Sequence, residues 1–370
     1  MQRGYITRYG EFGREQSEVS LLEREFADSL GCRYAVALNS CGSALFLALL
    51  SAGVQPGDRV LLNAFTLAPV PGSIVHAGAV PVFVECNDQY LIDLGDLAHK
   101  AETGAGVLML SHMRGHIADM HAVTKLCQRY GLTLIEDCAH TLGAKWDGTP
   151  SGRFGDVACY SFQSYKHINA GEGGMLVTDD PDIAAKAILY SGSYMMYGQN
   201  GAAPAAEVFA RHQASIPNLS LRMHEVTAAI ARPQIQLLAE RGRAWNASYR
   251  DLAARLAAIE HVTVPMRDPR EEYIASSIQF SFTGISAERI ARIVDRCAAQ
   301  GVGIKWFGRP EPRGFTSHFE HWGYAPEQPP MNQTREMLSR LCDMRIPLTL
   351  TPEDRKLIAQ VIADSIQATR

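Results

Sequence analysis

An amine, a hydroxyl and several glycines occur together between Ser161 and Gly174, and this combination can react with an aldehyde and bind a phosphate. Lys166 follows Ser161 by five positions, after the apolar segment Asp156–Phe162, and the turn sequence GEGG comes next. A lysine near a strand end can be partly desolvated, which lowers its pKa and frees the amine to attack an aldehyde. The Ser161 hydroxyl can donate to a phosphate, and glycines let the backbone pass close to a ligand. The alternative is a surface lysine before a hairpin turn.

A carboxylate stands at the end of another apolar segment, Leu132–Asp137. If this segment is a strand, Asp137 can hold the protonated nitrogen of an aromatic ring by a charge-assisted hydrogen bond. The alternative is that Asp137 caps a following helix, which is common after a strand. His140, three residues on, could contact the same ligand or simply pack.

Small residues open the first apolar helix of the chain. The sequence Asn39-Ser40-Cys41-Gly42-Ser43 precedes the run LFLALL (45–50). The free N–H groups and the positive dipole end of a helix can bind an anion. Simple N-capping by these residues is the alternative.

Alternating helical and strand patterns must position these residues. Apolar segments alternate with a helical pattern at 119–130, which predicts an α/β fold with a mainly parallel sheet covered by helices. Ligands of such sheets bind beyond the carboxyl ends of the strands, where Asp137 and the segment after Phe162 should lie. The predicted strands of this region are 59–62, 80–85, 107–110, 132–137, 156–162 and 174–178.

The C-terminal part has a different pattern and predicts a smaller α+β domain. A long Ala-, Leu- and Arg-rich helix is expected at 225–259, a strand at 277–282, a helix at 286–300 and a strand at 302–306. The stretch 198–206 is expected to be an exposed loop. We place the large domain at 1–222, with the N-terminal segment, and the smaller domain at 223–370, with the long connecting helix.

The composition excludes several classes of protein. The chain has 370 residues, 46% of them hydrophobic and 20% charged, and a formal net charge of -4, so it has no basic footprint for nucleic acid. Charged residues interrupt the apolar runs, which argues against a membrane span, and the first residues lack the apolar core of a secretory signal. Eight scattered cysteines without a C-x-x-C pair indicate reduced thiols in a cytoplasmic enzyme.

The order of these motifs resembles a known family. A helix start that can bind an anion is followed by Asp137 and then, 29 residues further along, by Lys166. This order is similar to that of the fold-type I enzymes dependent on pyridoxal 5'-phosphate, in particular the DegT/StrS-like sugar aminotransferases. The sharpest stretch is Leu134–Thr178, and the pieces that support it are Phe65-Thr66, Gly78–Phe83, Ala118–Met120 and Arg222-Met223 with Ala228-Ala229.

The resemblance implies roles for individual residues. Lys166 matches the Schiff-base lysine, and Asp137 matches the partner of the pyridine nitrogen. The other residues expected to bind the cofactor are the phosphate ligand Ser161, the helix start Cys41, Gly42 and Ser43, and Leu67, His140 and Gln163. A lysine at 166, where related sugar dehydratases have histidine, favours amino transfer.

Three positions depart from the family pattern. Leu67 stands where an aromatic residue usually covers the pyridine ring, so stacking is lost. Ser220 stands where an asparagine often reaches the phosphate of the neighbouring subunit. Arg114 stands where an uncharged residue is usual, and it could bind an anionic group of the substrate or form an ion pair with a nearby acid such as Asp119.

The resemblance therefore implies an aminotransferase with the aspartate-aminotransferase-like fold. The expected reaction moves an amino group from an amino-acid donor, glutamate or glutamine, to the carbonyl acceptor, a sugar-like or related small metabolite. The reaction is expected to belong to a biosynthetic pathway. The resemblance also implies a homodimer whose active site lies near the interface. Decarboxylation, elimination or aldol-type chemistry on the same scaffold is one alternative, and a non-catalytic sensor that binds the cofactor is another. His112, His116 and His121 are not expected to bind a metal.

Overall fold

A computed structural model describes residues 6–9, 14–313 and 318–369 of the chain. A seven-stranded sheet forms its centre, with the strand order β1-β9-β8-β5-β4-β2-β3. Only β9 runs against its neighbours, and the other described strand pairs of this sheet are parallel. The predicted mainly parallel sheet is therefore confirmed. Its strands are β1 (Tyr34–Leu38), β2 (Arg59–Asn63), β3 (Val80–Val84), β4 (Val107–Ser111), β5 (Thr133–Asp137), β8 (Val157–Ser161) and β9 (Gly174–Thr178).

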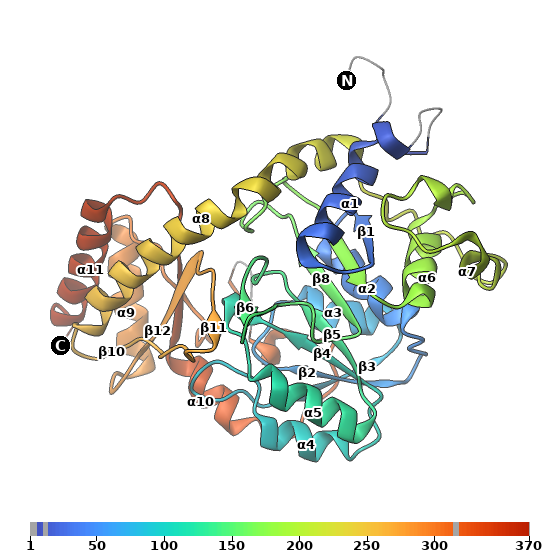
Figure 1. Cartoon of the computed structure of the whole chain (residues 1–370). Helices are drawn as coiled ribbons and strands as arrows, with labels where there is room; N and C mark the ends of the chain where they lie inside the picture. The colour runs from blue at the N-terminus through green and yellow to red at the C-terminus, as the bar shows by residue number, and fades with distance from the viewer. Residues whose placement is uncertain (1–5, 10–13, 314–317, 370) are drawn as a thin grey trace.

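Helices cover both faces of this sheet (Figure 1). Neighbouring residues of each strand enter different cores, because successive side chains of a strand point to opposite faces. Val60 and Leu62 pack in one core and Leu61 in another. One face is covered by α2 (Cys41–Ser51), α3 (Pro69–His76) and α6 (Pro181–Ser191), and the other by α1 (Glu18–Leu30), α4 (Leu94–Ala101) and α5 (Met120–Tyr130).

A second, four-stranded sheet has the order β10-β12-β14-β13. It packs against helices around its own core, which contains Phe280, Phe282 and Ile293. The elements are β10 (Val262–Thr263), β12 (Ser277–Phe282), β13 (Lys305–Trp306), β14 (Leu341–Arg345), α9 (Ala287–Ala299) and α11 (Pro352–Gln367). The strand expected at 302–306 is shorter than predicted, because only Lys305 and Trp306 pair with β14.

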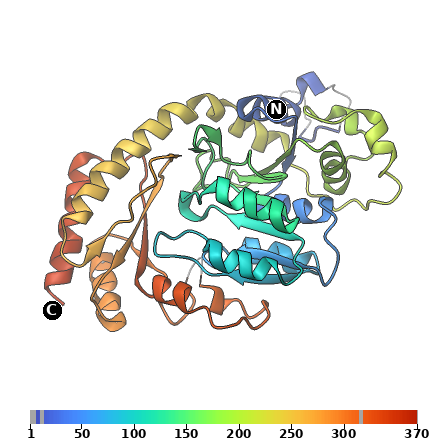
Figure 2. The same cartoon turned by 60° about the horizontal axis from the view of Figure 1, so that its bottom comes forward.

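The helix α8 (Glu225–Ala257) extends from the large sheet to the C-terminal sheet, as both views show (Figures 1 and 2). Its first half packs beside α1 through Ala228 and Ala231, and its second half enters the C-terminal core through Leu252 and Leu256. The domain boundary at 222 and 223, just before this helix, stays a prediction. Among the described residues, no helix combines the length and the hydrophobicity that are needed to cross a membrane.

The remaining elements are short. A three-stranded sheet joins β11 (Glu271–Glu272), β6 (Lys145–Trp146) and β7 (Thr149–Pro150), and α7 (Ala206–Ala210) and α10 (Asn332–Arg340) complete the helices. The 3-10 turns are η1 (Arg14–Gln16), η2 (Met113–Gly115), η3 (Tyr197–Gln199) and η4 (Phe319–His321).

The stretch 198–206 is only partly the exposed loop that we expected. Gly198, Ala205 and Ala206 are exposed, but Asn200 and Pro204 are buried, and a Cβ on Gly201 would collide with the backbone of Ser20 in α1. The buried part was not predicted, because small residues allow close packing against a helix as readily as they allow exposure.

Candidate active site

A cavity of about 490 Å³ lies where the carboxyl ends of β5 and β8 face the first residues of α2. Cavities of this size hold small molecules in many proteins. Nine of the predicted site residues line it: Cys41, Gly42, Leu67, Arg114, Asp137, His140, Ser161, Gln163 and Lys166. Ser43 lies on a neighbouring surface beside Gly42. Ser220 is exposed and lines no described cavity, because its amide and hydroxyl both donate to Asn218 Oδ1.

The start of α2 forms one wall of the cavity. Ser40 caps the helix by accepting a hydrogen bond from the Ser43 amide at 3.0 Å, so the capping alternative is confirmed, and anion binding stays a prediction. The cap approaches β9 so closely that a Cβ on Gly174 would lie 2.4 Å from the backbone of Ser40. Cys41 and Gly42 line the cavity at the positive end of the helix, and any side chain at 42 would enter the space beside Pro69. This wall suits an anion.

Asp137 ends β5, is buried and lines the same cavity. Ser111 lies beside it in the neighbouring strand and donates its hydroxyl to Asp137 Oδ2 at 2.7 Å. The amide of Ala139 donates to Oδ1 at 3.1 Å. No helix begins directly after Asp137 in the described chain, so the helix-cap alternative is wrong, and the carboxylate is instead fixed at the cavity wall.

Lys166 and His140 form a hydrogen bond of 2.9 Å between Nζ and Nε2. Burial lowers the pKa of Lys166 to about 8, although the charge of Asp137 partly opposes this shift. Burial also holds the pKa of His140 well below its usual value, and the charge of Lys166 adds to this effect. His140 is therefore neutral and can accept from the ammonium, and a share of the lysine amines is uncharged near neutral pH. The alternative of a surface lysine is wrong.

Ser161 and Gln163 follow β8 toward the same wall as the α2 start. The backbone N–H of Gln163 donates to Ser161 Oγ at 3.3 Å, which leaves the serine hydroxyl hydrogen for another acceptor. Gly174, opposite Ser161 in β9, keeps this strand end close to the helix start. Leu67 is half-buried against the large core and presents an aliphatic surface to the cavity.

Glu136, next to Asp137, points to the other face of β5 and holds a loop. Its carboxylate accepts from the amides of Gly152, Phe154 and Gly155 and pairs with His112 Nε2 at 3.0 Å. His112, Glu136 and Cys138 form a compact buried group, but these contacts already occupy the carboxylate. His116 contacts Gln279 and His121 contacts Asp147, so the three histidines weighed from the sequence face three separate partners.

Arg114 contacts a different acid from the one that we expected. Its Nη2 lies 3.1 Å from Asp343 Oδ2, whereas Asp119 caps α5 and pairs with Arg270. The ion-pair alternative is confirmed, but the acid is Asp343 and not Asp119, because β14 brings Asp343 across from the C-terminal sheet, which sequence proximity does not reveal.

Sequence reasoning also missed Arg345, Tyr165 and Glu172, which line the cavity. The Arg345 guanidinium carbon lies 3.8 Å from the centre of the Tyr165 ring. The alternation of apolar and charged residues in Leu341–Arg345 was the available signal for a strand with one polar face.

Comparisons with known proteins agree with this geometry. The model of the DegT/DnrJ/EryC1/StrS aminotransferase family matches residues 6–363. A spore coat polysaccharide biosynthesis protein, SpsC, of Bacillus subtilis (strain 168) is 32% identical over 228 residues, which cover 60% of this chain and 57% of the relative. The GDP-perosamine synthase of Caulobacter vibrioides is 34% identical over 219 residues, which cover 59% of this chain and 56% of the relative. The match thus spans little more than half the length of these two relatives.

A longer match joins the chain to the 3-amino-5-hydroxybenzoate synthase of Amycolatopsis mediterranei (strain S699). The two are 31% identical over 290 residues, which cover 77% of this chain and 72% of the relative. A crystal structure of 3-amino-5-hydroxybenzoic acid synthase superposes with a TM-score of 0.84 and 27% identity over 99% of this chain and 94% of that one. The aminotransferase TlmJ of Streptoalloteichus hindustanus has a TM-score of 0.84 at 20% identity, over 99% of this chain and 93% of that one, and shows the shared fold.

Proposed function

Because the chain belongs to the DegT/DnrJ/EryC1/StrS aminotransferase family, we propose that it is an aminotransferase dependent on pyridoxal 5'-phosphate. It moves an amino group from glutamate or glutamine to a keto or aldehyde carbon of a small, sugar-like or related metabolite in a biosynthetic pathway. The observation that carries this proposal is that Lys166, Asp137, Ser161 and the start of α2 line one cavity.

The chemistry of these residues fits the cofactor. The amides at Cys41 and Gly42 and the Ser161 hydroxyl would hold its phosphate, and Asp137 would hold its ring nitrogen. Leu67 and Gln163 line the same cavity. When bound, pyridoxal phosphate supplies an electron sink for the carbon that gains or loses the amino group.

The chain's own residues would move protons and hold the reacting groups in position. Lys166 offers an amine whose pKa of about 8 lets it be protonated in one step and unprotonated in another. His140 accepts a hydrogen bond from this amine and so fixes its direction. Ser111 holds the Asp137 carboxylate toward the cavity, which keeps its negative charge where a ring nitrogen needs a partner.

The cofactor lysine and the reaction type can be tested together. Borohydride reduction of the holoenzyme and peptide mapping should place the pyridoxyl group on Lys166. Lys145→Ala, in the short strand β6, should leave the label unchanged. Adding glutamate should convert the cofactor to pyridoxamine phosphate with one 2-oxoglutarate per site. Release of carbon dioxide without pyridoxamine phosphate would favour the other chemistry on this scaffold, and no response to any donor would favour a sensor.

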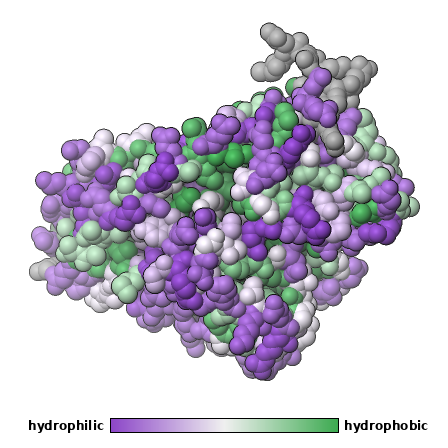
Figure 3. Space-filling model, viewed as in Figure 1, coloured by the Kyte–Doolittle hydropathy of each residue, from purple (hydrophilic) through white to green (hydrophobic). Residues whose placement is uncertain are grey.

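We also infer that two copies form a dimer near the site. Val226, Ile230 and Leu237 are exposed on α8, and Tyr194 and Met195 are exposed on the loop after α6. Figure 3 shows hydrophobic side chains gathered beside the middle of α8. Exposed apolar groups of this kind mark contact surfaces. Light scattering should give twice the mass of one chain, and Ile230→Glu should reduce it to one.

A cytoplasmic location is the further part of this proposal. All eight cysteines are free, and seven of them are buried. Free thiols are typical of a reducing compartment. Fractionation of cells that make the protein should recover it with cytoplasmic marker enzymes.

A further inference from the structure

One face of the C-terminal sheet is polar and borders the cavity. In β12 and β14, the side chains of Ile278, Phe280, Cys342 and Met344 enter the C-terminal core. Because side chains alternate along a strand, the residues between them face the other way. These are Ser277, Gln279, Asp343 and Arg345, and Lys305 of β13 lies opposite Asp343.

Arg114 reaches this polar face from the large domain. It is 6% exposed and has a positive φ of 57°, a conformation that residues with a side chain rarely adopt. Its Nη2 contacts Asp343 Oδ2, but its Nε is buried without a hydrogen-bond partner among the described residues. The other oxygen of Asp343 accepts from Gln279 Nε2 at 2.7 Å. A guanidinium has five N–H donors, so this shared carboxylate leaves Arg114 with donors to offer.

Three cations therefore surround one acid where two cavities meet. A second cavity of about 520 Å³ is lined by Arg114, Lys305, Asp343 and Arg345, and both arginines also line the cofactor cavity. Tyr165 borders both spaces and holds the Arg345 guanidinium over its ring. Buried or half-buried positive charges need a counter-charge, and the Asp343 carboxylate that pairs with Arg114 carries only one negative charge for the two arginines.

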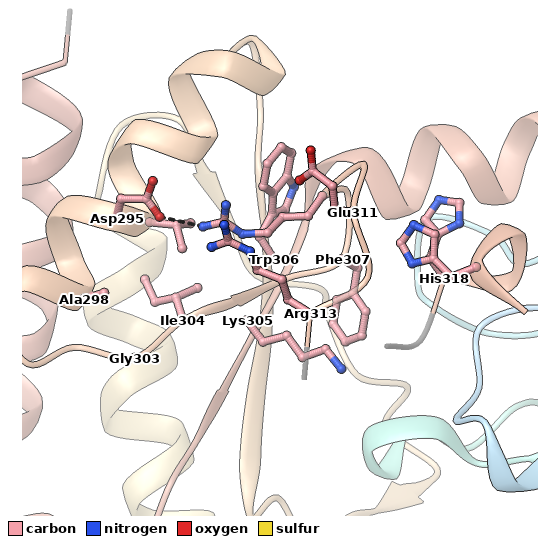
Figure 4. Close-up of a pocket in the computed structure, with 13 residues that line it drawn as sticks. Asp295, Ala298, Gly303, Ile304, Lys305, Trp306, Phe307, Glu311, Arg313 and His318 are labelled. Atoms are coloured by element: carbon pink, nitrogen blue, oxygen red, sulfur yellow. Dashed lines mark hydrogen bonds and ion pairs between the residues drawn. The ribbon is translucent and has the colours of Figure 1, made fainter. Parts of the chain in front are cut away.

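The third cation faces the same junction. Burial and the charge of Arg114 lower the pKa of Lys305 to about 8, although the charge of Asp343 partly opposes this shift. Lys305 also borders a third cavity, of about 440 Å³, where its chain extends past Phe307 and away from Asp295 (Figure 4). Its Nζ lies 4.9 Å from the centre of the Phe307 ring. The crowding of cations at the junction would be relieved by an anionic ligand.

We propose that Arg114 and Arg345 form a carboxylate subsite, and that the carbonyl acceptor, like the amino donor, carries a carboxylate. This inference rests on the proposed aminotransferase function. Donor and acceptor occupy the same cavity in turn, so a subsite built into its wall meets both of them. A neutral acceptor would leave Arg345 and the remaining N–H donors of Arg114 facing an uncharged group in one half-reaction. Paired N–H donors of arginine bind a carboxylate in two parallel hydrogen bonds.

The first test measures binding to the holoenzyme with probes that cannot react. By calorimetry, benzoate should bind at least about tenfold more tightly than benzamide, and Arg345→Gln should reduce benzoate affinity about tenfold to a hundredfold, as expected for a charge-assisted hydrogen bond. Arg345→Lys, which keeps the charge but loses the paired donors, should recover only part of the affinity. Arg309→Gln is the matched control, since Arg309 pairs with Asp295 away from the junction. Equal binding of benzoate and benzamide, or an equal loss in Arg309→Gln, would overturn the subsite.

The second test follows the acceptor half-reaction of enzyme loaded with pyridoxamine phosphate. In single turnover, 3-oxocyclohexanecarboxylate should react faster than its amide, and Arg345→Gln should remove the difference. Tighter, Arg345-dependent binding of uridine diphosphate than of benzoate would overturn the carboxylate in favour of a phosphoryl group. Arg114→Gln with Asp343→Asn removes both charges of the pair and tests Arg114 without leaving a buried charge unpaired.

The two levels of the proposal fail separately. If glutamate yields pyridoxamine phosphate but neither probe pair is discriminated, the carboxylate subsite is wrong and the aminotransferase stands. If no donor yields pyridoxamine phosphate, the proposed function is wrong and the assignment of the acceptor falls with it.

Discussion

The acidity of Lys166 can be measured in the protein without its cofactor. At pH 7, a pKa of about 8 leaves about a tenth of the amines uncharged, whereas an ordinary lysine with a pKa of about 10.4 has about one uncharged amine in two to three thousand. Lys166 should therefore present roughly 200- to 300-fold more nucleophile than an ordinary lysine at this pH. The large cause is burial, so the advantage should vanish on unfolding.

The perturbation that tests this reasoning is Asp137→Asn. The charge of Asp137 raises the pKa of Lys166, so its removal should shift that pKa downward and increase the uncharged fraction at pH 7. Competitive labelling with isotopic acetic anhydride between pH 6 and 11 gives the titration midpoint of each lysine by mass spectrometry. The exposed Lys356 serves as the internal reference.

Two results would refute the electrostatic account. A Lys166 midpoint near that of free lysine would show that the amine is not desolvated. An upward shift of the midpoint in Asp137→Asn would show that the carboxylate acts on Lys166 by something other than its charge. The same variant should slow turnover with an amino donor about tenfold to a hundredfold in the holoenzyme, because a charge-assisted hydrogen bond to the ring is lost.

Three further changes test the supports of the site. Gly174→Ala should displace the helix cap at Ser40 and weaken cofactor binding measured by equilibrium dialysis. Gly72→Ala is the control, because a Cβ there would meet open space, and it should leave the affinity unchanged. Equal affinities of the two variants would mean that the Ser40 backbone shifts without disturbing the site. Ser161→Ala should also weaken cofactor binding, by about tenfold, because one phosphate donor is lost, and unchanged affinity would remove Ser161 from the phosphate site. Glu23→Gln should lower the free energy of unfolding by about 3–5 kcal/mol in urea titrations, because it leaves the buried Arg8 without its counter-charge; a loss below about 1 kcal/mol would mean that water reaches this pair.

Local patterns were enough to predict much of the sheet. The strands Gly174–Thr178 and Ser277–Phe282 have the predicted bounds, because β-branched and aromatic residues stand between turn residues there. The strand Tyr34–Leu38 was not predicted, since two of the five residues in its sequence YAVAL are alanines, which are depleted in strands. Its partner β9 was predicted from its own local pattern, but nothing in either sequence shows that the two strands pair.

The same limit applies to the site. The residues that follow one strand end, such as Asp137 or Lys166, could be placed at the sheet edge from the sequence, and the cavity brings them together. Arg345 and Asp343 could not, because their position depends on how the C-terminal sheet packs against the large domain. Arg114 was singled out from its type, but its partner was misplaced for this reason.

The order of strands in the large sheet has a consequence for how the protein is made. β1 lies beside β9, so residues 34–38 emerge from the ribosome long before their partners at 174–178. Until then the edge of β1 that β9 will cover is open, and an uncovered strand edge is a template for misassembly. Arg345 is added later still, on β14. In stalled nascent chains long enough for residues 174–178 to have left the ribosome, β1 should therefore be protected from proteolysis. The cationic junction is assembled only near the end of synthesis.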